Sequence, residues 1–321
     1  MGKRKKKNRE IGVGYYVVAY IDLLGQKDVL RNLKDLPDES NPDSWDSFLN
    51  TLRDVYSPIK HMRTSFRQFF DSFSQRSGDI GELNKQQRDA FKAATSYPIR
   101  IQPFSDAVVI SVPLRIAEYR VPTRGILGVL SAAAMTCIFC LAAGHPLRGG
   151  IDVGIAMDMS SNEIYGAALA RAYTLESKVA QYPRIVVGQE LIQYLRISAK
   201  EESNDAHAKF RREIAKHCLD LVAIDVDEYP ILDYLGEGFR DDFARATDIG
   251  KGKDIIAKAY RHVVQCFSKF RGEQNTKLSD RYERVMHYFE SRLGLWFKSE
   301  NEIADLKRLP DHNDTNSTAS V

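Results

Sequence analysis

The chain is poor in cysteine. Its 321 residues include four, too few for the disulfide framework of a small secreted protein, and neither end carries an apolar signal segment. We therefore expect a protein of the reducing cytosol. Cys137 and Cys140 form a C-x-x-C spacing, but no second Cys or His pair lies near them in the sequence. This pattern predicts packing inside a helix and disfavours zinc or redox chemistry.

Long apolar runs are also scarce. One stretch, Leu130–Gly144, lies between Arg124 and His145, and we interpret it as a core helix that is too short to cross a bilayer. We therefore expect no membrane partner. No internal repeat is present.

Basic residues outnumber acidic ones only because of the first ten positions. Residues 1–10 hold six of the 46 Lys and Arg residues and one acid, which leaves 40 basic and 42 acidic residues elsewhere. We interpret this run as a solvated tail rather than an arm for nucleic acid or a membrane surface. The chain also lacks a basic, aromatic-rich sheet motif, which argues against a nucleic-acid partner.

What the sequence does contain is an alternation of predicted strands and helices. Apolar periodicity predicts a strand at 15–25, helices at 45–72 and 84–95, a hairpin at 97–114, a helix at 121–143, a strand at 148–157, a helix at 165–181 and a strand at 184–187. This order predicts an α+β fold in which helices back an antiparallel sheet.

The second half of the chain is predicted to be mostly helical. It contains a charged helical stretch at 200–217, short strands at 219–225 and 229–234, and amphipathic helices at 252–271 and 278–297. We divide the chain into a disordered basic tail (1–12), a main domain (13–190), an extension of strands and helices packed on it (191–305) and a disordered polar tail (306–321).

Two aspartates, Asp22 and Asp106, lie at or next to the ends of predicted buried strands. Asp22 ends the apolar run that starts at Val17, and Asp106 stands at the turn of the predicted hairpin. A carboxylate in a buried strand is unfavourable without a positive partner. If the two strands are neighbours, the pair suits magnesium or manganese, whose remaining ligands are often substrate phosphates. The alternative is that one aspartate pairs with an arginine and the other caps the turn.

Four runs in residues 15–190 resemble the catalytic domain of class III nucleotidyl cyclases. They are Tyr20-Ile-Asp-Leu-Leu-Gly25, Phe104-Ser-Asp106, Leu147-Arg-Gly-Gly-Ile-Asp-Val-Gly154 and Ile164-Tyr-Gly-Ala-Ala-Leu-Ala-Arg-Ala-Tyr-Thr-Leu-Glu176. The resemblance implies a ferredoxin-like, palm-type sheet and two metal ions held by Asp22, the Leu23 carbonyl and Asp106. It also implies attack of the 3′-hydroxyl of a nucleoside triphosphate on its own α-phosphate, with loss of pyrophosphate.

The chain departs from this family where the family contacts the base and the ribose. Gln102 stands where a lysine is common, whereas Glu163 keeps the usual acidic residue. Ala170 and Thr174 replace an asparagine and an arginine. We therefore expect a rebuilt base pocket, with Gln102, Glu163 and Thr174 as candidate substrate contacts.

A cyclase also needs positive charge near the phosphate oxygens of its transition state. Arg171, Thr174 and Lys178 are spaced to share one face of a helix, so Arg171 is the first candidate and Lys178 the second. The alternative for Arg171 is a surface ion pair with Glu176 or a neighbour. Arg148 is a third candidate, although an arginine at the start of a strand is more often structural.

The altered pocket is similar to that of the bacterial pyrimidine nucleotide cyclases of Pycsar anti-phage systems. That likeness implies conversion of UTP or CTP to cyclic UMP or cyclic CMP, a preference for manganese over magnesium, a homodimer, and a separately encoded effector that the product activates. Tyr20 and Tyr165 are predicted to lie in the core, with stacking on the base as the alternative. The competing functional hypothesis is a cyclase-like module that senses nucleotides without turnover.

Overall fold

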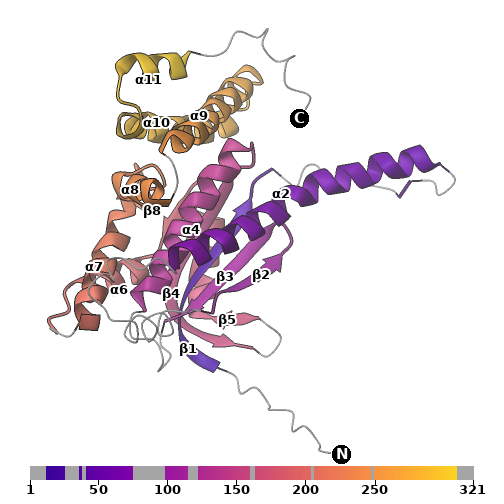
Figure 1. Cartoon of the computed structure of the whole chain (residues 1–321). Helices are drawn as coiled ribbons and strands as arrows, with labels where there is room; N and C mark the ends of the chain where they lie inside the picture. Colours follow the sequence, from indigo (N-terminus) through magenta and orange to yellow (C-terminus); the bar gives the residue numbers. More distant parts are fainter. Residues whose placement is uncertain are drawn as a thin grey trace, which may run out of the picture.

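The structure, a computed structural model, describes residues 12–25, 36–37, 41–74, 98–114, 122–159, 163–203, 206–246 and 249–308. Within these residues it is a mixed α+β fold in which helices pack on both faces of an eight-stranded, mostly antiparallel sheet (Figure 1). The predicted fold class is confirmed at this level.

The sheet is centred on two long strands, β1 and β4. Its members are β1 (Gly12–Leu23), β2 (Arg100–Phe104), β3 (Ala107–Pro113), β4 (Leu147–Asp158), β5 (Ile164–Gly166), β6 (Ile185–Val187), β7 (Val222–Ile224) and β8 (Pro230–Leu232). The order is β2-β3-β1-β4-β6-β8-β7, with β5 paired to β4. Only β4 and β6 run parallel among these pairs. The sheet therefore continues past residue 190 into the predicted extension.

The described residues form these helices around the sheet. They are α2 (Pro42–Ser74), α4 (Thr123–Ala142), α5 (Ala167–Thr174), α6 (Gln189–Ala199), α7 (Ala206–Asp220), α8 (Glu237–Ala246), α9 (Ile249–Gly272), α10 (Thr276–Trp296) and α11 (Glu300–Lys307). A short π-helix, η1 (Leu175–Val179), follows α5 directly. Helices α9, α10 and α11 lie together at one end of the molecule (Figure 1).

Strand β1 is apolar on both faces because helices cover both. Val17 and Ala19 belong to the large core that α2 and α4 share with the sheet. Tyr16 and Val18 point the other way, as alternate strand residues must, and pack in a smaller cluster with α5. The nearly continuous apolar run that predicted a buried strand is thus explained.

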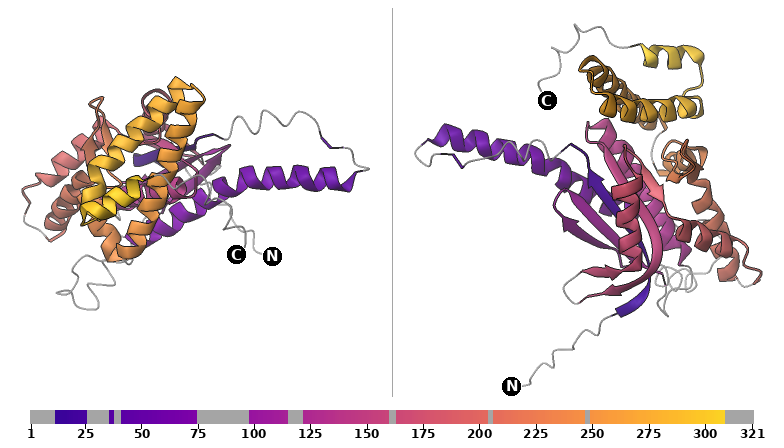
Figure 2. Two further views of the ribbon diagram at one scale, coloured as in Figure 1. Left: turned by 90° about the horizontal axis from the view of Figure 1, so that it is seen from above. Right: turned by 180° about the vertical axis from the view of Figure 1, so that it is seen from behind.

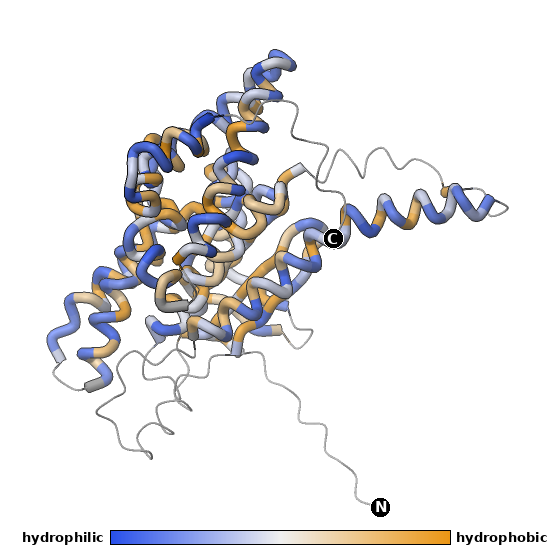
Figure 3. The backbone as a smooth tube through the Cα atoms, turned by 45° about the horizontal axis from the view of Figure 1, so that its top comes forward, coloured by the Kyte–Doolittle hydropathy of each residue, from blue (hydrophilic) through white to orange (hydrophobic). Residues whose placement is uncertain are grey.

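Helix α2 covers the sheet with only its second half. Met62, Phe66 and Phe70 are buried in the large core, whereas the first half projects from the body (Figure 2). Polar and apolar residues alternate along this projecting part (Figure 3). The helix predicted at 45–72 is confirmed, and the one predicted at 84–95 lies outside the described residues.

Helix α4 is the central core helix and confirms the prediction at 121–143. With 20 residues it is long and apolar enough to cross a membrane, so the expectation that it is too short is wrong. Burial explains its composition instead, since 83% of its most apolar window is buried inside the protein. Cys137 and Cys140 pack there as predicted, and burial raises the pKa of both thiols.

The helix predicted at 165–181 is in fact three elements. A strand, β5, pairs with the end of β4, then α5 begins, and its last turns widen into η1. Gly150 on β4 permits this close packing, because a Cβ atom there would overlap the carbonyl oxygen of Ala172. A π-helix advances by a smaller angle per residue than an α-helix. Residues 171–178 therefore do not form one regular α-helix, because Arg171 and Thr174 lie in α5 and Lys178 lies in η1.

The remaining predictions hold for most elements and are incomplete in the extension. The strands at 15–25, 148–157 and 184–187, the hairpin at 97–114, and the helices at 252–271 and 278–297 correspond to β1, β4, β6, β2–β3, α9 and α10. Helices α6, α8 and α11 were not predicted. The strands predicted at 219–225 and 229–234 shrink to three residues each, since α7 continues to Asp220.

The junction between α4 and α9 should make the protein sensitive to mild acid. Burial lowers the pKa of His145, which follows α4, and the nearby His61 lowers it further. Burial also lowers the pKa of His262 on α9, and His145 adds to that effect. The unfolded chain then binds more protons below about pH 6.5. The free energy of unfolding should fall between pH 7.5 and 5.5 in urea titrations. His262→Gln should reduce this fall, and the exposed His287→Gln should not; equal falls in both variants would contradict the assignment.

Candidate active site

The structure brings Asp22 and Asp106 to the same end of the sheet. Strands β1 and β3 are antiparallel neighbours, and Asp22 stands opposite Ala107, the residue after Asp106. The N–H of Leu23 donates to the carbonyl oxygen of Asp106 over 3.2 Å. The condition under which the two aspartates were expected to come together, that their strands are neighbours, is therefore met.

Arg148 lies across the next strand pair, directly opposite Asp22 on β4. Its Nε and Nη2 donate to Oδ2 of Asp22 over 3.2 and 3.1 Å. The same Nε lies 2.7 Å from Oε1 of Glu176 on η1. One guanidinium therefore joins two buried carboxylates, and the pairing of one aspartate with an arginine, which was the alternative to a metal site, is found for Asp22. Of the three basic candidates, Arg148 is the one shown in contact with Asp22.

Glu176 is the site residue that sequence reasoning missed. Its side chain is 3% exposed because η1 turns it onto the sheet. The pKa of Tyr20 rises to about 12, since burial and then the charges of Glu176, Asp22 and Asp106 disfavour the phenolate. Three acids therefore act on one small region next to Arg148. The sequence pattern does not reveal this role of Glu176, because the direction of its side chain depends on the π-helix η1.

The oxygen donors at this end of the sheet suit a hard divalent cation. Asp22 and Asp106 supply carboxylates, and the backbone carbonyl of Leu23, the residue after Asp22, is a third candidate oxygen. Magnesium is commonly held by one or two carboxylates and completes its shell with water and phosphate. In the part of the chain that the structure describes, no group of three or more His, Cys, Asp or Glu side chains could hold a metal ion. A cation here would thus depend on the oxygens of a bound substrate.

Arg171, the first sequence candidate, lies further along β4. Its Nε is 3.2 Å from Oδ2 of Asp152, four residues from Arg148, or about 13 Å at a strand rise of about 3.3 Å per residue. Gly154 leaves the space for this guanidinium, because a Cβ atom there would overlap Nη2 of Arg171. The ion pair considered with Glu176 is therefore replaced by one with Asp152.

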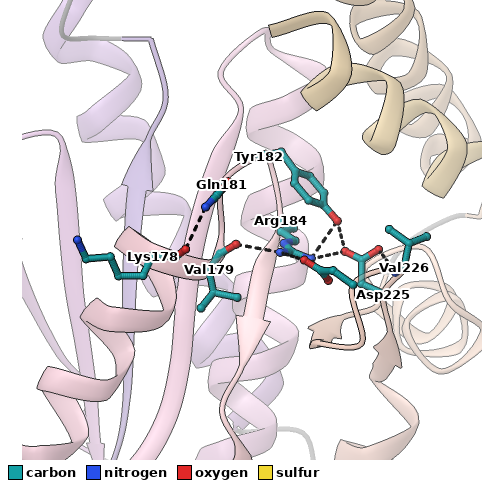
Figure 4. Close-up of polar contacts among 8 residues, drawn as sticks. Lys178, Val179, Gln181, Tyr182, Arg184, Asp225 and Val226 are labelled. Carbon is teal, nitrogen blue, oxygen red and sulfur yellow. Dashed lines mark hydrogen bonds and ion pairs between the residues drawn. The ribbon is translucent and has the colours of Figure 1, made fainter. Parts of the chain in front are cut away.

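Thr174 and Lys178 face other surroundings. The Thr174 hydroxyl donates to the carbonyl of Ala170 in its own helix over 2.8 Å. Lys178 is exposed, its carbonyl accepts from the amide of Gln181 over 3.3 Å, and its amine points away from Arg184 (Figure 4). Neither contact joins these residues to the aspartate pair.

A hydrogen bond between β2 and β5 brings the two predicted base contacts, Gln102 and Glu163, near each other. Oε1 of Gln102, on β2, accepts from the N–H of Ile164 over 3.4 Å, and Ile164 directly follows the exposed Glu163. Ile164 packs in the same apolar cluster as Tyr20. The Gln102 amide can still offer a ligand its NH₂ group as a donor and the second lone pair of its oxygen as an acceptor.

The two predicted core tyrosines differ. Tyr20 is buried in the smaller cluster and meets Tyr173 edge-on, with ring centroids 5.3 Å apart. Tyr165 is 67% exposed on β5, so its predicted core position is wrong. The cause is β5 itself, a strand that turns this side chain outward where a helix was expected.

A second buried arginine fixes the end of the segment that carries Glu176. Arg184, whose side chain is 4% exposed, donates to the carbonyl of Val179 over 2.8 Å. It also forms ion pairs of 2.6 Å with Asp225 and Asp227, between β7 and β8 (Figure 4). Since Val179 ends η1, these contacts tie the π-helix to the extension.

Comparisons with models of protein families, with curated proteins and with solved structures give no match for this chain.

Proposed function

We propose that this chain is a metal-dependent nucleotide cyclase that converts UTP or CTP to 3′,5′-cyclic UMP or cyclic CMP and pyrophosphate, as a second messenger in bacterial defence against phage. The observation that carries the proposal is the meeting of Asp22, Asp106 and Arg148 at one end of the sheet. Two carboxylates for a divalent cation and an arginine for phosphate oxygens suit a nucleoside triphosphate.

The path of the chain through the sheet supports the proposal. The segment β1-α2-β2-β3-α4-β4 forms strands in the order β2-β3-β1-β4, which is the split βαβ arrangement of ferredoxin-like folds. This is the arrangement that the resemblance to class III cyclases implies. Because one fold hosts many activities, the site rather than the fold carries the functional conclusion.

The residues of the site have distinct tasks in this reaction. A divalent cation held by Asp22, Asp106 and the Leu23 carbonyl would supply stabilisation of the charge on the reacting phosphate and of the attacking hydroxyl. Arg148 would offer guanidinium donors to phosphate oxygens, and Glu176 holds the guanidinium through the same Nε that donates to Asp22. Arg171 and Lys178 would act only through a second subunit, in the homodimer that the resemblance implies.

The base pocket fits a pyrimidine through Gln102. Its NH₂ group can donate to a carbonyl oxygen of uracil, or to O2 or N3 of cytosine. A lysine in this position would place a charge there instead. Both pyrimidine triphosphates therefore belong to the proposal, together with a cytoplasmic location and a separate effector that binds the product.

A nucleotide sensor without turnover is the second candidate. The observation that favours it is the engagement of Arg171 with Asp152 and of Thr174 with its own helix, away from Asp22 and its partner Arg148. A sensor would bind the triphosphate and metal at the same residues and release no pyrophosphate.

One assay separates the two functions. The full chain is incubated with ATP, GTP, CTP or UTP, each with Mn²⁺ or Mg²⁺, and the products are separated by chromatography. We expect a cyclic monophosphate and an equal amount of pyrophosphate from UTP or CTP, with Mn²⁺ more effective than Mg²⁺. Binding of a triphosphate with no cyclic product would favour the sensor, and product from purines alone would contradict the proposed pocket.

A further inference from the structure

Helix α2 holds the turn that presents Asp106. Nη2 of Arg63 donates to the carbonyl oxygen of Ser105 over 2.8 Å and lies within hydrogen-bond range of that of Ala107, at 3.3 Å. These two carbonyls belong to the residues on either side of Asp106. A single guanidinium group from a helix 42 and 44 positions earlier in the chain therefore spans the turn.

The backbone of the turn is restrained at all three residues. Besides the two carbonyls that Arg63 holds, the carbonyl of Asp106 accepts from the N–H of Leu23. Ser105 has a φ of +53°, a left-handed conformation that a non-glycine residue adopts only where its surroundings impose it. The direction in which the Asp106 carboxylate points thus depends on contacts from outside the turn.

The environment of Arg63 suits a fixed donor. Its neighbours Met62 and Phe66 are buried against the sheet, so this part of α2 is held firmly by the core. Burial lowers the pKa of Arg63, yet a guanidinium remains charged at any pH of interest. A charged donor to neutral carbonyls makes stronger hydrogen bonds than an amide would.

We infer that Arg63 is a positioning residue, which orients Asp106 for the divalent cation through the backbone of the β2–β3 turn. The inference rests on the proposed function, because it assigns Asp106 to the cation. Arg63 touches neither substrate nor metal in this assignment. Its effect should therefore be seen first in the affinity for the cation and only through that in turnover.

Two substitutions of Arg63 separate the contribution of its guanidinium geometry from that of its positive charge. Arg63→Lys keeps the charge but offers a single ammonium in place of the guanidinium fork, and Arg63→Met removes the donors while keeping an unbranched apolar side chain. Arg67→Lys is the matched control, since Arg67 is exposed one turn further along α2. Thermal melting of each variant records whether α2 still packs.

The test measures cation binding without turnover. Free Mn²⁺ is followed by electron paramagnetic resonance while the full chain is titrated in the presence of 3′-deoxy-UTP or 3′-deoxy-CTP, which lack the attacking hydroxyl. Removing a group that orients a metal ligand typically weakens metal affinity about 10–100-fold. We expect a loss in that range for Arg63→Met, a smaller loss for Arg63→Lys and wild-type binding for Arg67→Lys. In assays with the corresponding triphosphate, the metal concentration for half-maximal rate should rise in step, with most of kcat recovered at saturating Mn²⁺.

The possible outcomes distinguish a failure of the role inferred for Arg63 from a failure of the proposed function. If wild type binds Mn²⁺ and cyclises a triphosphate while both Arg63 variants bind Mn²⁺ as tightly, the inference is wrong and the proposed function stands. If wild type binds no Mn²⁺ with either deoxynucleotide, the metal site itself is wrong. A loss of kcat with unchanged Mn²⁺ affinity would also overturn the positioning role.

Discussion

Asp22→Asn and Asp106→Asn should each reduce cyclic nucleotide formation by about 1000-fold or more. Each change replaces a charged metal ligand with a neutral amide oxygen. A cation contributes several kcal/mol to the stabilisation of a phosphoryl transition state, and every 1.36 kcal/mol corresponds to a tenfold change in rate. The measurement is the initial rate of pyrophosphate release at saturating Mn²⁺ with the preferred triphosphate.

The control variant for this comparison is Asp305→Asn. Asp305 lies on α11, its side chain is 70% exposed and its ion pair with Arg308 is a surface contact, so activity should stay at the wild-type level. Circular dichroism and melting temperatures show whether Asp22→Asn disturbs the ion pair with Arg148 beyond the site. Near-wild-type rates in both Asp22→Asn and Asp106→Asn would show that these residues are not the metal ligands, even for an active cyclase.

Arg184→Met should destabilise the protein by about 3–5 kcal/mol. The guanidinium is buried and pairs with Asp225 and Asp227, and removal of one partner leaves the other charges uncompensated in a poorly solvated place. Urea unfolding at pH 7 measures the change in free energy. The matched control is Arg308→Met, whose side chain is 80% exposed and should change stability by less than about 0.5 kcal/mol.

The pH dependence of this effect has a defined sign. The hydrogen bond from Arg184 lowers the pKa of Asp227. A carboxylate with a lowered pKa in the folded state stabilises the fold above its unfolded pKa of about 3.9 and loses that contribution as pH falls through the folded value. The difference between wild type and Arg184→Met should therefore shrink below about pH 4. A difference that stays constant from pH 7 to pH 3 would contradict the ionic character of the contact.

The place of each aspartate in its own strand or turn was predictable, because the apolar runs of β1 and β3 are visible in the sequence. The pairing of β1 with β3 was left as a condition, since α2 and β2 lie between them in the chain and short connections favour pairing only between elements that are close in sequence. Once β1 and β3 pair, the two residues are brought together by the backbone alone. No side-chain packing needs to be known to place them.

The contacts of the basic residues Arg148 and Arg171 were not predictable from the sequence in the same way. Arg148 and Glu176 meet because the helix after β5 changes from α to π, and periodic patterns in a sequence carry no signal for a single π-turn. Arg171 satisfied the expected spacing, but the space left by Gly154 draws it to Asp152. In both cases tertiary packing overrides local spacing.

The positions of α6, α8 and α11 were missed for a related reason. These helices are short, and a short amphipathic segment is stabilised by the surface on which it packs more than by its own residues. Leu191, for example, is fully buried, and its N–H donates to the carboxylate of Asp152 on β4. The N-terminus of α6 is thus fixed by a residue 39 positions earlier, which sequence periodicity does not reveal.

The sheet that passes from β4 through β6 to β8 has a consequence for how the protein can be divided. Val186 of β6 pairs with Ile231 of β8, and β6 also pairs with β4. A division of the chain near residue 190 would therefore leave β6 and β8 each with an unpaired edge. Fragments 13–190 and 191–305 are therefore not independent folding units. The strands on the two sides of residue 190 should therefore lose their structure together on unfolding, because each completes the sheet of the other.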